Sequence, residues 1–142
     1  MDEREDEVRN LELGIRNGFG IRSAELKDGE LQRRTKAFAL QTIKFVESLP
    51  LGRTTEVLGK QLLRSATSVG ANYRAACRAR SKADFVNKLA MVEEEADESA
   101  YWLELIAEAA PAQSDATSRL SAEASEITAM VVASIKSFRI RQ

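Results

Sequence analysis

The chain has 142 residues, of which 44% are hydrophobic and 30% charged, as expected for one globular domain with its own core. A single cysteine excludes an internal disulfide, and the lack of histidine excludes histidine-dependent catalytic and metal sites. No apolar run approaches the roughly 20 residues needed to span a bilayer. The acidic N-terminus lacks the apolar region of a secretory signal, so we expect a cytoplasmic protein without membrane contact.

Residues 1–28 show the weakest periodicity, with a charged segment followed by a glycine-containing one. We expect them to form an N-terminal arm outside the core, and residues 29–142 to form the folded domain. Three interpretations of the arm stay open: a disordered segment, a short docking helix, or an extension upstream of the natural start.

Four amphipathic helices are predicted after the arm. The first covers residues 30–49 and ends before Pro50, because proline disfavours helical geometry in the preceding residue. The second covers residues 54–78, with Thr54 or Thr55 as its cap. Small residues are frequent in this helix, and Gly70 costs roughly 1 kcal/mol relative to alanine. A close contact with a neighbouring helix would be a reason to retain this glycine.

The third helix is predicted to start near Lys82, because Ser81 and Asp84 form a capping-box pattern, and to end before Pro111. The fourth covers residues 114–140. Each helix carries an apolar stripe at alternating three- and four-residue steps. The stripes are Leu31, Thr35, Phe38, Thr42, Phe45 and Leu49; Leu58, Leu62, Ala66 (or Ser65), Val69, Tyr73 and Ala76; Phe85, Leu89, Val92, Ala96, Ser99, Leu103 and Ile106; and Leu120, Ala124, Ile127, Val131, Ile135 (or Ser134) and Phe138.

Short connections make sequential helices antiparallel, and a period near 3.5 residues favours shallow crossing angles. The sequence therefore predicts an all-α fold, an antiparallel up-down-up-down four-helix bundle with an N-terminal arm.

A set of residues in the segment 61–105 forms a recognisable pattern: Gln61, Leu62, Arg64, Ala66, Ser68, Val69, Asn72, Arg80, Ser81, Asp84, Phe85, Glu95, Glu98, Tyr101, Trp102 and Leu103. With this pattern the chain resembles the four helix bundle protein family, also known as the ribosomal-RNA intervening-sequence protein family. The resemblance covers roughly residues 31–139 and is strongest over residues 61–105. The resemblance implies a small bundle that assembles with itself, commonly into a ring of five. A related accessory protein of diversity-generating retroelements binds nucleic acid and a reverse transcriptase, but it is strongly basic, whereas this chain has a net charge of −1.

The charge is unevenly distributed along the chain. Residues 50–92 contain eight basic and two acidic residues, whereas residues 93–126 contain ten acidic and one basic. A candidate basic patch could contact phosphate or could form salt bridges with the acidic third helix, and the near cancellation of charge favours salt bridges. Its members are Arg64, Arg74, Arg78, Arg80 and Lys82.

The acidic run at residues 93–98 could suggest a carboxylate metal site, but di-metal bundles use histidines and glutamates from other helices. We favour a solvated or inter-subunit ion-pair face that includes Glu94, Glu95 and Glu98. Tyr101 and Trp102 are adjacent and therefore point about 100° apart. One is expected inside the bundle and the other at a subunit interface, where aromatic residues are enriched.

Asn72 lies on or beside the buried stripe of the second helix. Its amide could hydrogen-bond across the bundle as a buried polar register residue, or it could line a ligand site, and we favour the first. Cys77 has no histidine to act as its base, so we interpret it as a packing residue.

The sequence predicts a non-enzymatic, self-associating scaffold or adaptor without catalytic residues, metal or cofactor. The alternative is a nucleic-acid or ribonucleoprotein accessory module that uses the basic residues of the second helix and the following turn.

Overall fold

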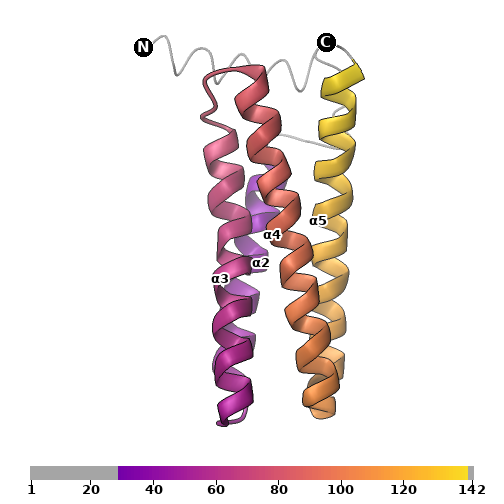
Figure 1. The fold of residues 1–142 in the computed structure, drawn as a ribbon. Coiled ribbons are helices and arrows are strands. Elements are labelled where there is room, and N and C mark those ends of the chain that lie inside the picture. Colours follow the sequence, from indigo (N-terminus) through magenta and orange to yellow (C-terminus); the bar gives the residue numbers. More distant parts are fainter. Residues whose placement is uncertain (1–28, 141–142) are drawn as a thin grey trace.

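The computed structural model describes residues 29–140, so the predicted N-terminal arm lies outside the described residues. The described part is a four-helix bundle without strands, which confirms the predicted all-α fold (Figure 1). Its helices are α2 (Glu30–Ser48), α3 (Arg53–Ala76), α4 (Lys82–Ala109) and α5 (Ser114–Ile140). A single 3-10 turn, η1 (Pro111–Gln113), connects α4 to α5.

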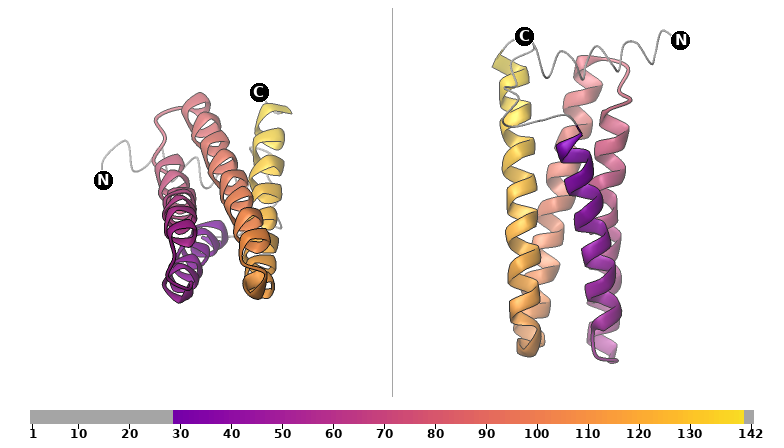
Figure 2. Two further views of the ribbon diagram at one scale, coloured as in Figure 1. Left: turned by 60° about the horizontal axis from the view of Figure 1, so that its bottom comes forward. Right: turned by 180° about the vertical axis from the view of Figure 1, so that it is seen from behind.

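Successive helices run in opposite directions, as the short connections predict (Figure 1). The longest seams are those of α4 with α3 and with α5, whereas α2 packs mainly on α3 and to a smaller extent on α5. Since α2 is the shortest helix, it begins below the level of the α3–α4 turn (Figure 2). Near that turn, Phe85 of α4 and Phe138 of α5 bring their ring centroids to 5.1 Å.

One continuous core fills the interior of the bundle. The predicted stripes are buried at every position except Leu49 and Leu58, which are half-buried at its edge. Residues from all four helices, such as Phe45, Val69 and Ile127, belong to this single cluster. The seven-residue spacing therefore identified the buried face of each helix correctly.

The helix ends follow local chemistry. Ser81 caps α4, because its hydroxyl oxygen accepts a hydrogen bond from the backbone N–H of Asp84 at 3.1 Å. The prediction that Thr54 or Thr55 caps α3 was wrong. Gly52 holds the cap position of α3 without a side-chain bond, and the Thr55 hydroxyl donates to the Pro50 carbonyl at 2.7 Å.

Two polar contacts, one in the interior and one at the edge, show how the helices are joined. In the interior, the Ser99 hydroxyl of α4 donates to the Ser65 hydroxyl of α3 at 2.8 Å, and both side chains are fully buried. At the edge, Arg34 of α2 contacts Glu123 of α5 at 2.6 Å, and this hydrogen bond raises the pKa of Arg34. Each contact joins two different helices and so helps to fix their relative position.

The placement of Asn72 differs from the predicted buried register residue. Its side chain is only half-buried, and its amide donates to the Ser68 carbonyl one turn earlier in α3 at 2.9 Å. A bond within one helix cannot align two helices. The Ser65–Ser99 pair is instead the buried polar contact between α3 and α4.

Candidate interaction surfaces

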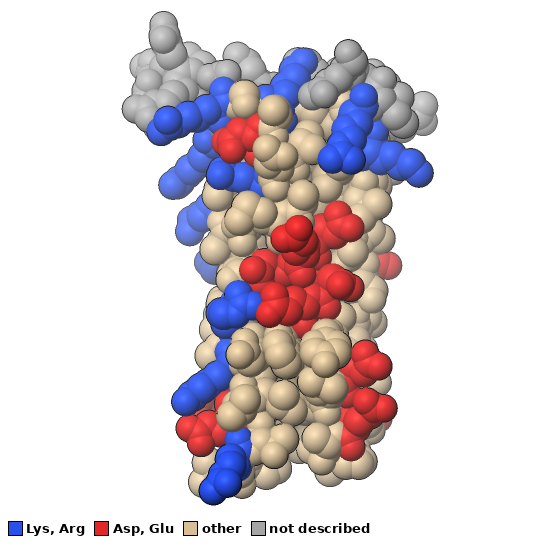
Figure 3. Space-filling view, in the orientation of Figure 1, with Lys and Arg blue, Asp and Glu red and all other residues tan. Residues whose placement is uncertain are grey.

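The acidic face lies on the exposed side of α4. Side chains of Asp and Glu gather over the middle of this helix, with Lys and Arg along the α3 side and at the end near the α3–α4 turn (Figure 3). Helix α4 contains eight acidic and two basic residues, so it is the most acidic element of the bundle. Glu94 lies on this face and is exposed.

Arg64 of α3 is the cation that neutralises part of the acidic face. Its guanidinium pairs with Glu98 and, at 3.4 Å, with Glu95. The Trp102 indole N–H also donates to Glu98 at 3.3 Å. The Arg64 hydrogen bond, aided by that of Trp102, lowers the pKa of the Glu98 carboxyl below its ordinary value.

An aromatic patch follows the acidic face toward the α2–α3 turn. Tyr101 is 52% exposed, whereas Trp102 is half-buried and packs against the core. Their rings meet edge to face with centroids 5.2 Å apart. Val57 of α3 is 56% exposed and lies two turns before Arg64 on the same side of that helix. Below the acidic side chains, the middle of this face is uncharged, with charged side chains at its two sides (Figure 3).

Three other arginines of the predicted basic patch do not share the ion pairs of Arg64. Arg74, Arg78 and Arg80 are exposed, and none forms an ion pair with any residue of the described range. Lys82 is the first residue of α4. Within residues 29–140, Arg64 forms the expected salt bridges to the acidic helix, whereas Arg74, Arg78 and Arg80 do not.

Two adjoining open hollows lie beside these arginines, and the second extends to α2. One, of about 730 Å³, is lined by Arg74, Arg78, Arg80 and Lys88 around two alanines and Asp84. The other, of about 470 Å³, lies between α2 and α3 and adds Arg33 and Lys36. Both hollows include Ala71 and Arg74, so the cations surround one continuous surface.

Comparison with known proteins places this bundle in a family. The family model described as 23S rRNA-intervening sequence protein matches residues 27–133, which cover all of the first three helices and most of α5. The chain belongs to this family. Among curated proteins, none matches the chain.

A solved structure supports the same family assignment. It is a protein of unknown function from the S23 ribosomal protein family of Bacteroides thetaiotaomicron, 34% identical in sequence with a TM-score of 0.70. The similarity covers 75% of this chain and 98% of that one. Family membership therefore establishes the fold and leaves the biochemical role open.

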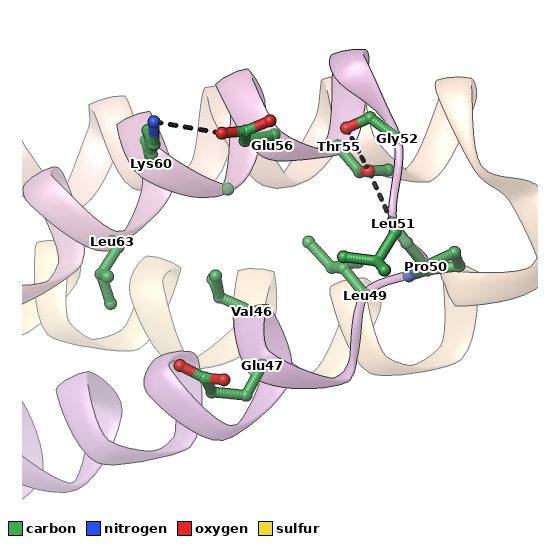
Figure 4. A pocket seen from close by; sticks show the side chains of 11 residues that line it. Val46, Glu47, Leu49, Pro50, Leu51, Gly52, Thr55, Glu56, Lys60 and Leu63 are labelled. Atoms are coloured by element: carbon green, nitrogen blue, oxygen red, sulfur yellow. Dashed lines mark hydrogen bonds and ion pairs between the residues drawn. The ribbon is translucent and has the colours of Figure 1, made fainter.

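The family member has a further hollow at its α2–α3 turn, of about 310 Å³. Val46 of α2 and Leu63 of α3 point into it from opposite sides (Figure 4). Glu47, Glu56 and Lys60 lie at its rim, and Lys60 pairs with Glu56 at 3.3 Å. The walls are mainly aliphatic and present no converging polar groups of the kind that orient a small ligand.

Sequence reasoning missed Arg33, Lys36 and Lys88 as neighbours of the unpaired arginines. Arg33 and Lys36 come one turn apart on the polar side of α2, which is a recognisable signal. The sequence of one helix does not reveal which side of α3 lies next to the polar side of α2. That placement depends on how the whole bundle packs.

Two classes of site have no counterpart in residues 29–140. No group of three or more histidine, cysteine or carboxylate side chains in this range is arranged to hold a metal ion. None of the helices described here combines the length and apolar character of a membrane-spanning segment.

Proposed function

We propose that this chain is a non-enzymatic, cytoplasmic scaffold that associates with copies of itself through the aromatic patch of α4. The observation that carries the proposal is Tyr101, a large aromatic side chain that is 52% exposed beside the half-buried Trp102. Aromatic side chains are enriched at protein interfaces and contribute disproportionately to their binding energy. A partner that covers this patch would bury the rings and exclude water from the ion pairs of Glu98.

The acidic face constrains how two copies can meet. A symmetric contact of the patch with itself would bring two acidic clusters close together, and like charges facing each other oppose association. The patch is better suited to a different face of the next copy. Such head-to-tail contacts form a closed ring when the rotation between copies closes, and the family resemblance suggests a ring of five.

Multi-angle light scattering after size exclusion tests this proposal. The wild-type protein should have a mass several times that of the 15.7 kDa chain. Tyr101→Glu should shift it toward the single-chain mass, because a carboxylate at the patch opposes burial. Leu40→Glu is the matched control, since Leu40 is 51% exposed on α2, away from the patch. A wild-type protein of single-chain mass would contradict the proposal.

The second candidate is a nucleic-acid or ribonucleoprotein accessory module. One observation favours it: Arg74, Arg78 and Arg80 have no ion pair within the described range, although they are close in sequence to the acidic helix. Cations without an acidic partner remain available to phosphate groups. This candidate uses a different surface from the aromatic patch, so the two functions can be tested separately.

A further inference from the structure

We propose that the basic surface binds the phosphate backbone of a nucleic-acid duplex without regard to sequence. The basic surface consists of Arg33 and Lys36 of α2, Arg74 of α3, and Arg78 and Arg80 of the α3–α4 turn. The inference rests on the second function proposed above and specifies its ligand, its residues and its mode of recognition.

The first support is that these cations are not neutralised. None of the five forms an ion pair with a residue in the range 29–140, in contrast to Arg64, whose guanidinium contacts two glutamates. Asp84 is the carboxylate that lines the larger hollow, and none lines the other. It is already engaged, because it accepts from the Arg80 backbone N–H at 3.3 Å and pairs with Lys88 at 3.5 Å. Among the described residues, this surface therefore carries a net positive charge.

The second support is the shape of the surface. Small residues, Gly70, Ala71 and Ala75, form the floor between the cations, so the two hollows merge around Ala71 and Arg74. Arg33 and Lys36 project from α2 on one side, and Arg78 and Arg80 from the α3–α4 turn on the other. A backbone with regularly spaced phosphates can contact both sides at once, whereas an isolated anion would reach only part of the set.

The residue types around the hollows favour a duplex over a single strand. Proteins that bind single strands stack the bases on aromatic side chains, and no aromatic residue lines either hollow. A protein partner would need an apolar anchor, and neither hollow is lined by a large apolar side chain. Arginine and lysine contacts to phosphates, without base contacts, provide affinity but no sequence preference.

The acidic face of α4 would orient the bound duplex. Glutamates and aspartates cover the middle of that helix, whereas cations line the α3 side and the end near the α3–α4 turn (Figure 3). Phosphates are repelled from the acidic face and attracted to the basic surface, so the duplex has one favoured side on which to bind.

The test compares binding of fluorescent RNA and DNA duplexes, and of an unstructured single strand, over about 50–200 mM salt. Both duplexes should bind, and the logarithm of affinity should fall linearly with the logarithm of salt. Arg74→Gln with Arg78→Gln should weaken binding about tenfold at low salt and reduce the steepness of this dependence by about 2, since each lost phosphate contact removes about 0.9. Equal affinity of the protein for the RNA and DNA duplexes would indicate recognition of the phosphate backbone. A strong preference for the RNA duplex would indicate contacts to the 2′-hydroxyl instead.

A matched control is Arg53→Gln with Arg119→Gln, which changes the net charge equally at two exposed arginines outside both hollows. This variant should bind duplexes as the wild type does. The inference is overturned if no duplex binds at low salt, if both double variants lose affinity equally, if the single strand binds better, or if only anionic phosphatidylserine vesicles bind. Light scattering of each variant measures its assembly independently of duplex binding. A loss of binding without a change in mass therefore concerns the basic surface and not the proposed assembly through Tyr101.

Discussion

Helix α3 has two seams that differ in how completely they are filled. In its middle part the seam with α4 is closed: Ser65 and Ser99 touch in the interior, and Arg64 spans the exterior to Glu95 and Glu98. Toward the α3–α4 turn this seam opens into the hollow of about 730 Å³. Along α2 the seam is open, with hollows of about 310 and 470 Å³ at its two ends. Small side chains are present on both sides of α3. On the α4 side Ser65 meets Ser99 directly, whereas on the α2 side Gly70 leaves room beside Thr35.

The difference shows that small residues alone do not specify close helix contact. At Ser65 the neighbouring helix brings a hydroxyl to 2.8 Å. At Gly70 an added Cβ would lie 3.5 Å from the nearest atoms of Thr35, an ordinary van der Waals distance. We therefore expect the closed seam to be sensitive to added volume and the open seam to be tolerant of it.

Among these substitutions, Ser99→Leu is expected to change the free energy of unfolding most. Leucine would place additional carbon atoms where the Ser99 hydroxyl oxygen lies 2.8 Å from that of Ser65, and the hydrogen bond would be lost. Helices α3 and α4 would have to move apart, at a cost of about 3 kcal/mol in the free energy of unfolding. Urea denaturation followed by circular dichroism measures this loss.

Ser125→Leu is the control for this change, because Ser125 is exposed on α5. The same substitution there should change the free energy of unfolding by no more than about 0.5 kcal/mol. If Ser99→Leu were equally mild, the seam between α3 and α4 would not be closely packed, and the comparison of the two seams would fail.

Gly70→Ala, on the open seam, is expected to raise the free energy of unfolding by an intermediate amount, whereas Ser99→Leu lowers it. The methyl group fits beside Thr35 without displacing it, and alanine is a better helix former than glycine. The variant should be more stable by about 0.5–1 kcal/mol. Gly59→Ala should gain less, because its added Cβ would approach a Val46 methyl carbon at 3.3 Å, which requires a small shift. A loss of stability for Gly70→Ala would mean that α2 lies closer to α3 than described.

The buried faces could be predicted from the sequence because each depends on one helix alone. The spacing of Leu31, Phe38 and Phe45, for example, places these side chains on one stripe whatever the stripe packs against. The cap of α3 was predicted wrongly because the helix begins at Arg53, so Gly52 takes the cap position and Thr54 and Thr55 lie within the first turn. The exact first residue of a helix is set by the turn before it, which the apolar stripe does not define.

The candidate surfaces depend on how helices are placed relative to one another, and a linear pattern does not contain that placement. Arg64 and Arg74 are ten residues apart on α3, so they point about 80° apart around its axis. One reaches the glutamates of α4, and the other lies beside α2 and has no carboxylate partner among the described residues. Cancellation of charge along the sequence therefore did not predict cancellation in space.

The smallest expected change in stability concerns Glu98, at the exterior of the closed seam, and it depends on pH. Hydrogen bonds from Arg64 and then Trp102 hold the pKa of Glu98 below its ordinary value of 4.5. A carboxyl group with a depressed pKa in the folded state stabilises the fold above about pH 4.5, and this contribution is lost as the pH falls through the lower folded pKa. Because the Glu98 side chain is 37% exposed, screening by solvent and salt makes the contribution smaller than that of either preceding change.

Glu98→Gln removes the titrating group while keeping the size of the side chain. The variant should be slightly less stable than the wild type at pH 7, and the two should converge as the pH falls to about 3. Urea denaturation at both pH values measures the difference, and Glu94→Gln, at an exposed position of the same face, should show none at either pH. A stability difference for Glu98→Gln that does not change with pH would mean that the interaction with Arg64 is not what distinguishes the exterior of this seam.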